Sequence, residues 1–186
     1  MKYIFFFFSF FFLFGCGNSQ KEKENQSVFL LSSHSPPFQT IHKPEYHISL
    51  SEQWHEIPTS SYSDPLFRQQ NIETLFRKEA PFSPVFLLVT TESVPKSTTS
   101  LEFFSGTREN ERAAFFEFSE YKGKTLSNNG NAAQILHFSA RKTPSSPPLF
   151  FWQLPLVRHQ KGLVFTIAAA SPDMAGEAYD IFSNIL

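Results

Sequence analysis

The sequence predicts an α+β fold in which a central antiparallel sheet is flanked by helices. Residues 46–50 alternate between apolar and polar side chains, which is the pattern of a half-buried strand. Residues 150–157 and 163–170 form two long apolar runs separated by a short turn, which is typical of a hairpin. Residues 171–185 have the pattern of an amphipathic helix, whose apolar side needs a sheet face to cover.

Between these elements the sequence predicts a helix and a buried strand. Asp64 followed by Pro65 is typical of a helix start, because proline suits the first helical position. Pro81 and Pro84 end this segment, and the unbroken apolar run Val85–Val89 is predicted to be a strand buried on both faces. The predicted helix has an imperfect apolar face made of Leu66, Ile72, Leu75 and Phe76.

A further helix is predicted from residue 99. Thr99 and Glu102 have the spacing of a capping box, in which each side chain satisfies a backbone N–H of the first turn. Gly106 weakens the middle of this helix, because glycine is a poor helix former. The apolar residues expected to cover the sheet are Leu101, Phe104, Phe115 and Phe118.

The second half of the chain is predicted to contain two hairpins and the terminal helix. Residues 129–130 are Asn-Gly, a turn signal between residues 122–126 and the strand 132–139. In the later hairpin, Pro155 indicates an edge or a bulge, because proline cannot donate a ladder hydrogen bond. The terminal helix begins with residues 171–173, Ser-Pro-Asp, which cap and start helices. Its apolar stripe comprises Met174, Ala178, Ile181, Phe182 and Ile185.

The first 15 residues are predicted to be a signal peptide. Lys2 provides a positive start, and residues 3–15 are apolar apart from Ser9. This run is shorter than the roughly 20 apolar residues of a membrane-spanning helix, and its length suits a secretory signal. The alternative is a buried strand that ends in a core cysteine.

The tetrad Leu13-Phe14-Gly15-Cys16 resembles the bacterial lipobox, although Phe14 departs from the usual small or aliphatic residue. The resemblance implies that the thiol of Cys16 carries a diacylglycerol group and that cleavage follows Gly15. It also implies acylation of the new amino group, for example by palmitate. Lipid on Cys16 would anchor the protein stably in a membrane, since two or more acyl chains are sufficient.

Composition divides the chain into three predicted parts. Residues 1–15 are the signal peptide, residues 16–42 are the lipidated cysteine and a flexible polar tether, and residues 43–186 are a single domain. Cys16 is the only cysteine, so no disulfide is expected. Loss of Lys2 leaves 15 basic and 17 acidic side chains, a formal charge of −2 that does not favour nucleic-acid binding.

The order of the predicted elements is similar to that of the PsbP-like superfamily, which includes DcrB-type lipoproteins. The resemblance covers roughly residues 43–186. It implies a sandwich of an antiparallel sheet and helices, and a role in binding or in the assembly of larger complexes. The features that carry it are a short strand before a tryptophan (Tyr46, Ile48, Leu50, Trp54), a helix led by Leu101, the Asn-Gly turn, two aromatic strands and the helix Tyr179–Leu186.

A metal site is conceivable among the histidines but is not predicted. His42, His47 and His55 would meet around the first hairpin with Glu45 or Glu52 as further ligands. No ligand motif such as HExxH supports this possibility, and histidines at strand edges are usually solvated. The remaining histidines, His34, His137 and His159, are scattered.

The sequence predicts no catalytic residue and no cofactor. It contains no nucleophile motif and no glycine-rich phosphate loop. The carboxylate pairs Glu109 with Glu111, and Glu117 with Glu120, are expected on or near a polar helix face, where they keep the surface solvated.

One apolar surface is a candidate for binding. Phe151 and Val157 lie on the opposite strand face from Phe150 and Trp152, where they would line a groove for an apolar ligand or a partner. The leading hypothesis is a non-enzymatic binding or assembly module of the cell envelope, lipid-anchored at the outer membrane or cell surface rather than the inner membrane. The alternatives are a small hydrolase or metal-dependent enzyme, and a surface-exposed host-interaction protein.

Overall fold

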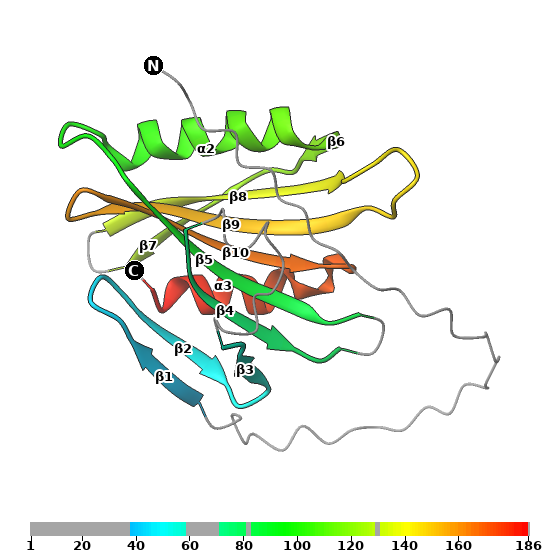
Figure 1. Ribbon diagram of the computed structural model, residues 1–186, viewed down its shortest axis with the longest axis horizontal. Helices are drawn as coiled ribbons and strands as arrows, with labels where there is room; N and C mark the ends of the chain where they lie inside the picture. Colours follow the sequence, from blue (N-terminus) through cyan, green and yellow to red (C-terminus); the bar gives the residue numbers. More distant parts are fainter. Residues whose placement is uncertain (1–37, 59–70, 81–82, 129–130, 186) are drawn as a thin grey trace.

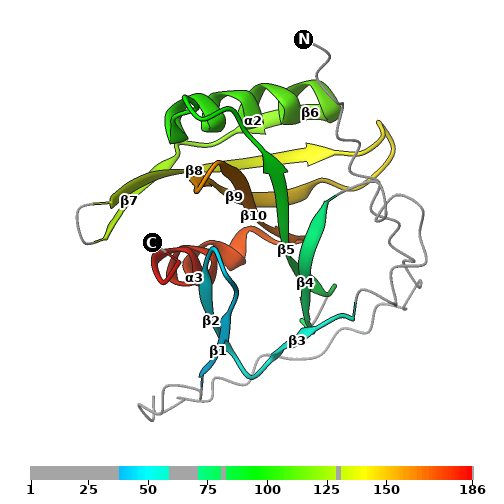
Figure 2. The same ribbon diagram turned by 60° about the vertical axis from the view of Figure 1, so that its left-hand side comes forward.

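The computed structural model describes residues 38–58, 71–80, 83–128 and 131–185. Within them, an eight-stranded antiparallel sheet lies between two helices, and a separate two-stranded hairpin packs beside it. Figures 1 and 2 show α2 and α3 on opposite faces of the sheet. The predicted α+β class and the antiparallel sheet are therefore confirmed. The strands are β1 (Phe38–His42), β2 (His47–Ser51), β3 (Trp54–Glu56), β4 (Ile72–Lys78), β5 (Val85–Ser93), β6 (Phe116–Glu120), β7 (Lys124–Asn128), β8 (Asn131–Arg141), β9 (Leu149–Arg158) and β10 (Lys161–Ala169); the helices are α2 (Ser100–Ala114) and α3 (Ala175–Ser183).

The strand order in the large sheet is β3-β4-β5-β10-β9-β8-β6, with β7 paired to one end of β8. The long hairpin β9–β10 therefore occupies the centre, and its two-residue turn is His159-Gln160. Both turn residues have positive φ, which is the geometry of a type I′ turn. β5 and β8 pair with the outer sides of this hairpin, and its apolar residues are buried on both faces because α2 and α3 each pack on one face of the sheet.

The main core lies on the α3 side of the sheet. It joins the hairpin β1–β2, the inward side chains of the central strands and the apolar stripe of α3. The alternation of apolar and polar side chains in residues 46–50 predicted one buried side, and Tyr46, Ile48 and Leu50 are indeed all buried in this core. The largest fully buried side chains of this core are Trp54, Trp152, Phe76, Phe165 and Phe182.

Helix α3 forms as predicted, with one turn of 3₁₀-helix, Pro172–Met174, in front of it. The side chain of Ser171 accepts a hydrogen bond from the backbone N–H of Asp173. Glu177 then fastens the helix to the sheet, because its carboxylate accepts bonds from Trp54 Nε1 at 2.9 Å and from Lys78 Nζ at 2.7 Å.

Helix α2 begins with the predicted capping box between Thr99 and Glu102. Its predicted extent is only partly correct, because the helix ends at Ala114 and Phe115 already has an extended backbone. Phe115 and Phe118 nevertheless contact the same small core as Phe104 on the α2 side of the sheet. Leu101 does not cover the sheet, since 62% of it is exposed.

The helix predicted after Asp64 is wrong for the part that the structure describes. Residues 72–78 form strand β4 instead, paired with β3 on one side and β5 on the other. Leu75 and Phe76 are both buried, on opposite faces of the sheet. Backbone pairing with two neighbours outweighs a weak helical spacing. Asp64, Pro65 and Leu66 lie outside the described residues.

The folded part begins earlier than the predicted boundary at residue 43. Residues 38–42 form β1, which pairs residue by residue with β2 and contributes Ile41 to the main core. These five residues therefore belong to the domain rather than to the predicted tether. The last residue pair between β9 and β8 joins Gln153 to Leu136, and Pro155 lies beyond it. On this side β9 is an edge strand at Pro155, as the proline predicted.

Candidate functional site

A polar cleft opens between helix α2 and the central strands β5, β10 and β9. Its volume is about 50 Å³. Three cross-strand rows form its floor, because Gln153 pairs with Thr166, Val164 with Thr90, and Gly162 with Glu92. The side chains that line it are Thr90, Thr91, Glu92, Thr107, Asn110, Glu111, Gln153, Val164 and Thr166, with Gly162 between them.

Two buried polar side chains distinguish this floor from the rest of the sheet. Among the described residues, the buried polar side chains are Thr74, Gln153 and Thr166. Thr74 is paired with the hydroxyl of Tyr46 at 3.0 Å, within the main core. Gln153 and Thr166 are 1% and 2% exposed and both line the cleft. Burial of polar groups is unfavourable unless they are satisfied, so this pair marks the site.

Gln153 joins the floor of the cleft to the helix above it. Its Nε2 donates to Glu111 Oε1 at 2.6 Å, and its own Oε1 is buried without a hydrogen-bond partner within the described residues. An unmet buried acceptor costs about 1–3 kcal/mol. The amide is therefore fixed by Glu111 with one acceptor unused.

Glu111 lies in an unusual electrostatic environment. Burial raises the pKa of its carboxyl to about 7, against the weaker lowering effect of the hydrogen bond from Gln153. Within the described part of the chain, no lysine or arginine pairs with it. The other carboxylates around α2 are compensated: Glu102 by the capping box, Glu109 by Arg112, Glu117 by Arg141, and Glu120 by Arg108 and Arg112.

Gly162 allows the helix to approach the sheet at one end of the cleft. A Cβ atom at this position would lie 2.5 Å from the ring of Phe103, too close for any real contact. Phe103 is the buried side chain of α2 and rests on this glycine. The bare backbone of β10 thus sets the position of the helix that carries Glu111.

The carboxylate pairs suggested by the sequence are separated by the structure. Glu109 points outward with its side chain 63% exposed, whereas Glu111 turns toward the sheet. The expectation of a solvated role is therefore wrong for Glu111. Glu117 and Glu120 lie in β6 rather than on a helix face, and both form ion pairs with arginines.

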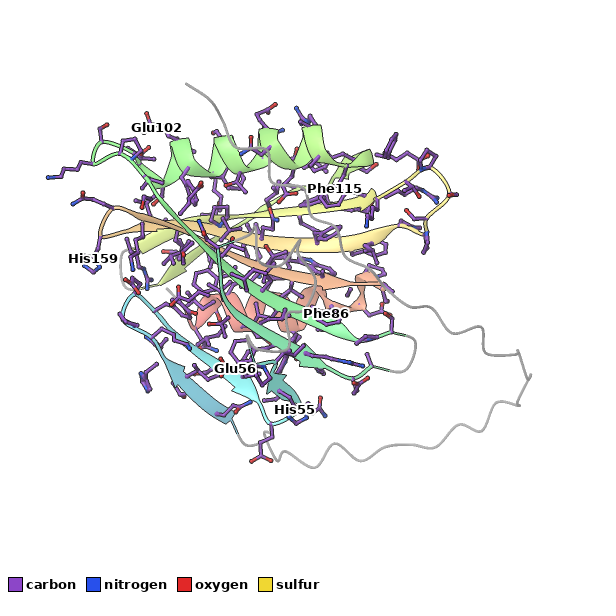
Figure 3. The ribbon with its side chains drawn as sticks, in the orientation of Figure 1. His55, Glu56, Phe86, Glu102, Phe115 and His159 are labelled. Carbon is purple, nitrogen blue, oxygen red and sulfur yellow. The ribbon has the colours of Figure 1, made fainter. Side chains whose placement is uncertain are left out.

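The histidines do not converge. His42 and His47 are neighbours on β1 and β2 with ring centroids 6.3 Å apart, while His55 lies on β3. His55 and His159 are well separated in Figure 3. No group of three metal-ligating side chains occurs among the described residues, which do not include His34.

His137 belongs to aromatic packing on the α3 side of β8 and β9. Its ring stacks on Trp152 at 5.0 Å and lies 4.6 Å from that of Tyr121. Burial lowers the pKa of His137, which keeps the imidazole neutral near pH 7. Its Nε2 and the Nε1 of Trp152 lack partners within the described residues, but two aromatic rings lie against the imidazole.

The apolar groove predicted at Phe151 and Val157 is filled at Phe151, whereas Val157 is half-buried. Phe151 is 3% exposed and packs against Phe138, Phe115 and Ala168 beneath α2. Phe104 of α2, together with Phe115 and Phe118 after the helix, supplies the partner that the sequence left open; Figure 3 shows Phe115 at the end of α2. The polar residue of the same strand face, Gln153, is the functional candidate that sequence reasoning missed.

A larger hollow of about 630 Å³ lies between β2 and α3. Its central charges, Lys78 and Glu177, are paired with each other. A third hollow of about 190 Å³ lies beside Leu101, Phe104 and Pro155. Neither has a buried polar atom without a partner among the described residues, so the cleft under α2 is the stronger candidate.

Comparison with solved structures shows the same architecture in proteins of very different sequence. Cyanobacterial PsbP (CyanoP) from Synechocystis sp. PCC 6803 superposes with a TM-score of 0.58 at 10% identity, covering 85% of this chain and 96% of that one. The chain has the PsbP/Mog1p-like fold. The Ran-binding protein Mog1p from Saccharomyces cerevisiae gives a TM-score of 0.54 at 9% identity over 81% of this chain and 93% of its own.

A third protein with the PsbP/Mog1p-like fold is PA94 from Pseudomonas aeruginosa, a protein of unknown function. It has a TM-score of 0.53 at 13% identity, covering 80% of this chain and 96% of its own. Neither family models nor curated protein sequences match this chain. The fold expected from the order of elements is thus confirmed.

Proposed function

We propose that the protein is a membrane-anchored lipoprotein of the cell envelope whose PsbP/Mog1p-like domain is a non-catalytic binding or assembly module. The observation that carries the binding role is the cleft under α2. It retains a buried acceptor on Gln153 and an unpaired carboxyl on Glu111. Polar groups that stay without a hydrogen-bond partner or counter-charge, although this lowers stability, are typical of sites where a ligand supplies the missing partner.

The composition of the cleft suits binding better than catalysis. Its lining contains hydroxyls, amides and two carboxyls, with Glu111 inside and Glu92 exposed at the rim. Among the described residues that line the cleft, no histidine, lysine or cysteine is present to activate a hydroxyl or to act as a nucleophile. Hydroxyl and amide groups of this kind are suited to orienting a ligand. Mog1p, which shares the fold, is named as a Ran-binding protein.

Anchoring rests on the lipobox-like residues Leu13–Cys16, which lie outside the described residues. No helix among the described residues is long and apolar enough to cross a bilayer. Lipid on Cys16 would hold the domain near the membrane: the 22 residues from Cys16 to Phe38 span at most about 75 Å when fully extended. A partner must therefore come within this distance of the outer membrane or cell surface.

Replacing Cys16 by Ala tests the anchor. The wild-type protein is expected to incorporate labelled palmitate and to stay with membranes after a high-salt wash, whereas Cys16→Ala loses the label and the membrane association. Asn18→Ala is the matched control, because it changes a neighbouring residue and leaves the thiol. Full retention of Cys16→Ala on salt-washed membranes would exclude the lipid anchor. In-cell crosslinking of the lipidated protein tests the binding role.

A further inference from the structure

The cleft under α2 offers hydrogen-bond acceptors and negative charge. Gln153 donates one of its two amide N–H groups to Glu111, and its acceptor Oε1 is buried without a partner among the described residues. Glu111 receives that bond on Oε1, which leaves Oε2 for a ligand. Glu92 adds a second carboxylate at the rim.

Positive charge is missing from the described part of this site. Among the lining residues that the structure describes, there is no lysine, arginine or histidine. The arginines of α2, Arg108 and Arg112, are engaged with Glu120 and Glu109 away from it. A group that complements the cleft therefore supplies N–H donors and positive charge, since a half-buried carboxylate is stabilised when it is paired and hydrogen-bonded.

The size of the cleft limits the occupant to a head group. A volume of about 50 Å³ holds roughly three to five water molecules by the usual measure of 10–15 Å³ each. This space suits the few heavy atoms of an ammonium or guanidinium group and leaves the rest of the ligand outside. Thr107, Asn110 and Thr90 line the cleft around such a group.

We propose that the cleft between α2 and strands β5, β10 and β9 binds an organic cation, a primary ammonium or guanidinium group that donates to Gln153 Oε1 and to the carboxylate of Glu111. The inference rests on the proposed binding role and names the chemistry of its ligand. The group belongs either to a basic side chain of a protein partner or to a free amine. Both present the same N–H donors and charge, so the experiment distinguishes them.

The electrostatics of Glu111 add a pH dependence to this binding. The raised pKa, about 7, means that the carboxyl is mostly protonated at pH 6 and mostly ionised at pH 8. Of the groups lining the cleft, Glu92 is the other one that titrates, and partial burial raises its pKa as well. A cation prefers ionised carboxylates, so its affinity is expected to rise about tenfold between pH 6 and pH 8.

Titration of the detergent-solubilised lipidated protein with small probes, followed by NMR or calorimetry, tests the proposal. We expect n-butylammonium and ethylguanidinium to bind saturably at pH 8, and neutral n-butanol and quaternary tetramethylammonium not to bind. Glu111→Gln should abolish the binding, whereas the matched variant Glu109→Gln on the outer side of the same helix should retain it. Tighter binding of a short lysine peptide than of n-butylammonium assigns the group to a protein partner, and the reverse order assigns it to a free amine.

Three results would overturn the proposal: equal binding of n-butanol, binding that survives Glu111→Gln, or no binding of either cation. A partner captured by in-cell crosslinking alongside a negative probe titration would leave the binding module intact and refute only the cation site. Capture of no partner with a positive titration would instead count against the assembly role and leave the site standing.

Discussion

Replacing Phe182 by Ala is expected to lower the free energy of unfolding by about 3–5 kcal/mol, the usual range for a buried phenylalanine. Phe182 is fully buried where α3 meets the main core, beside Ala178 and Ile185. Its removal loses apolar burial and leaves a cavity that the rigid sheet cannot close. Chemical denaturation measures the loss.

Asp180→Ala is the control for Phe182→Ala, because Asp180 is exposed on the same helix and its loss should change stability by no more than about 0.5 kcal/mol. Ending the chain before Met174 extends the test, since it removes α3 entirely and exposes one face of the sheet. The truncated domain is expected to be insoluble or protease-sensitive. Full thermal stability of Phe182→Ala or of the truncated domain would contradict the packing of α3 as the cover of the main core.

Replacing Glu111 by Gln is expected to stabilise the ligand-free domain at pH 8 by up to about 3.5 kcal/mol, the value of a shift from 4.5 to about 7 at roughly 1.4 kcal/mol per pKa unit. Glutamine at position 111 keeps an acceptor oxygen for Gln153 Nε2 and removes the half-buried negative charge of Glu111. The pKa of the Glu111 carboxyl is higher in the folded than in the unfolded wild type. The free energy of unfolding of the wild type therefore falls as pH rises from about 4.5 to about 7, because the carboxyl ionises more readily in the unfolded chain.

The stability difference between Glu111→Gln and wild type should therefore grow over this pH range and then stay constant. His137 also affects stability, because its lowered pKa makes the domain lose stability as pH falls below about 6.5. This effect is the same in both proteins, so it cancels when the two free energies of unfolding are subtracted. Glu109→Gln should show no comparable gain, since its side chain is exposed. A destabilised Glu111→Gln at pH 8 would mean that Glu111 is compensated in the folded domain.

Elements with a self-contained pattern were predictable from the sequence. Helix α3 contains its own cap, start and apolar stripe, and the β9–β10 hairpin contains two long runs joined by a short turn. Strand β4 was mistaken for a helix because Ile72, Leu75 and Phe76 also fit a helical spacing. Its state is decided by β3 and β5, which lie elsewhere in the sequence.

The site was less predictable than the fold. Glu111 is one of several charged residues in the last turns of α2, and which of them faces the sheet depends on where Phe103 rests on Gly162. One signal was present: Gln153 is the polar residue within the apolar run 149–157. The groove predicted at Phe151 failed for the same reason, since the residues that fill it come from α2, β6 and β8.

Photo-crosslinking in cells from one position at the rim of the cleft tests the binding role most directly. A photoreactive residue at Asn110, which is exposed and lines the cleft, is compared with one at Glu109, which points away. If the cleft is the binding site of a tethered module, Asn110 captures a defined partner, Glu109 does not, and Glu111→Gln removes the adduct. Equal capture from both positions, or an adduct unchanged by Glu111→Gln, would contradict that role.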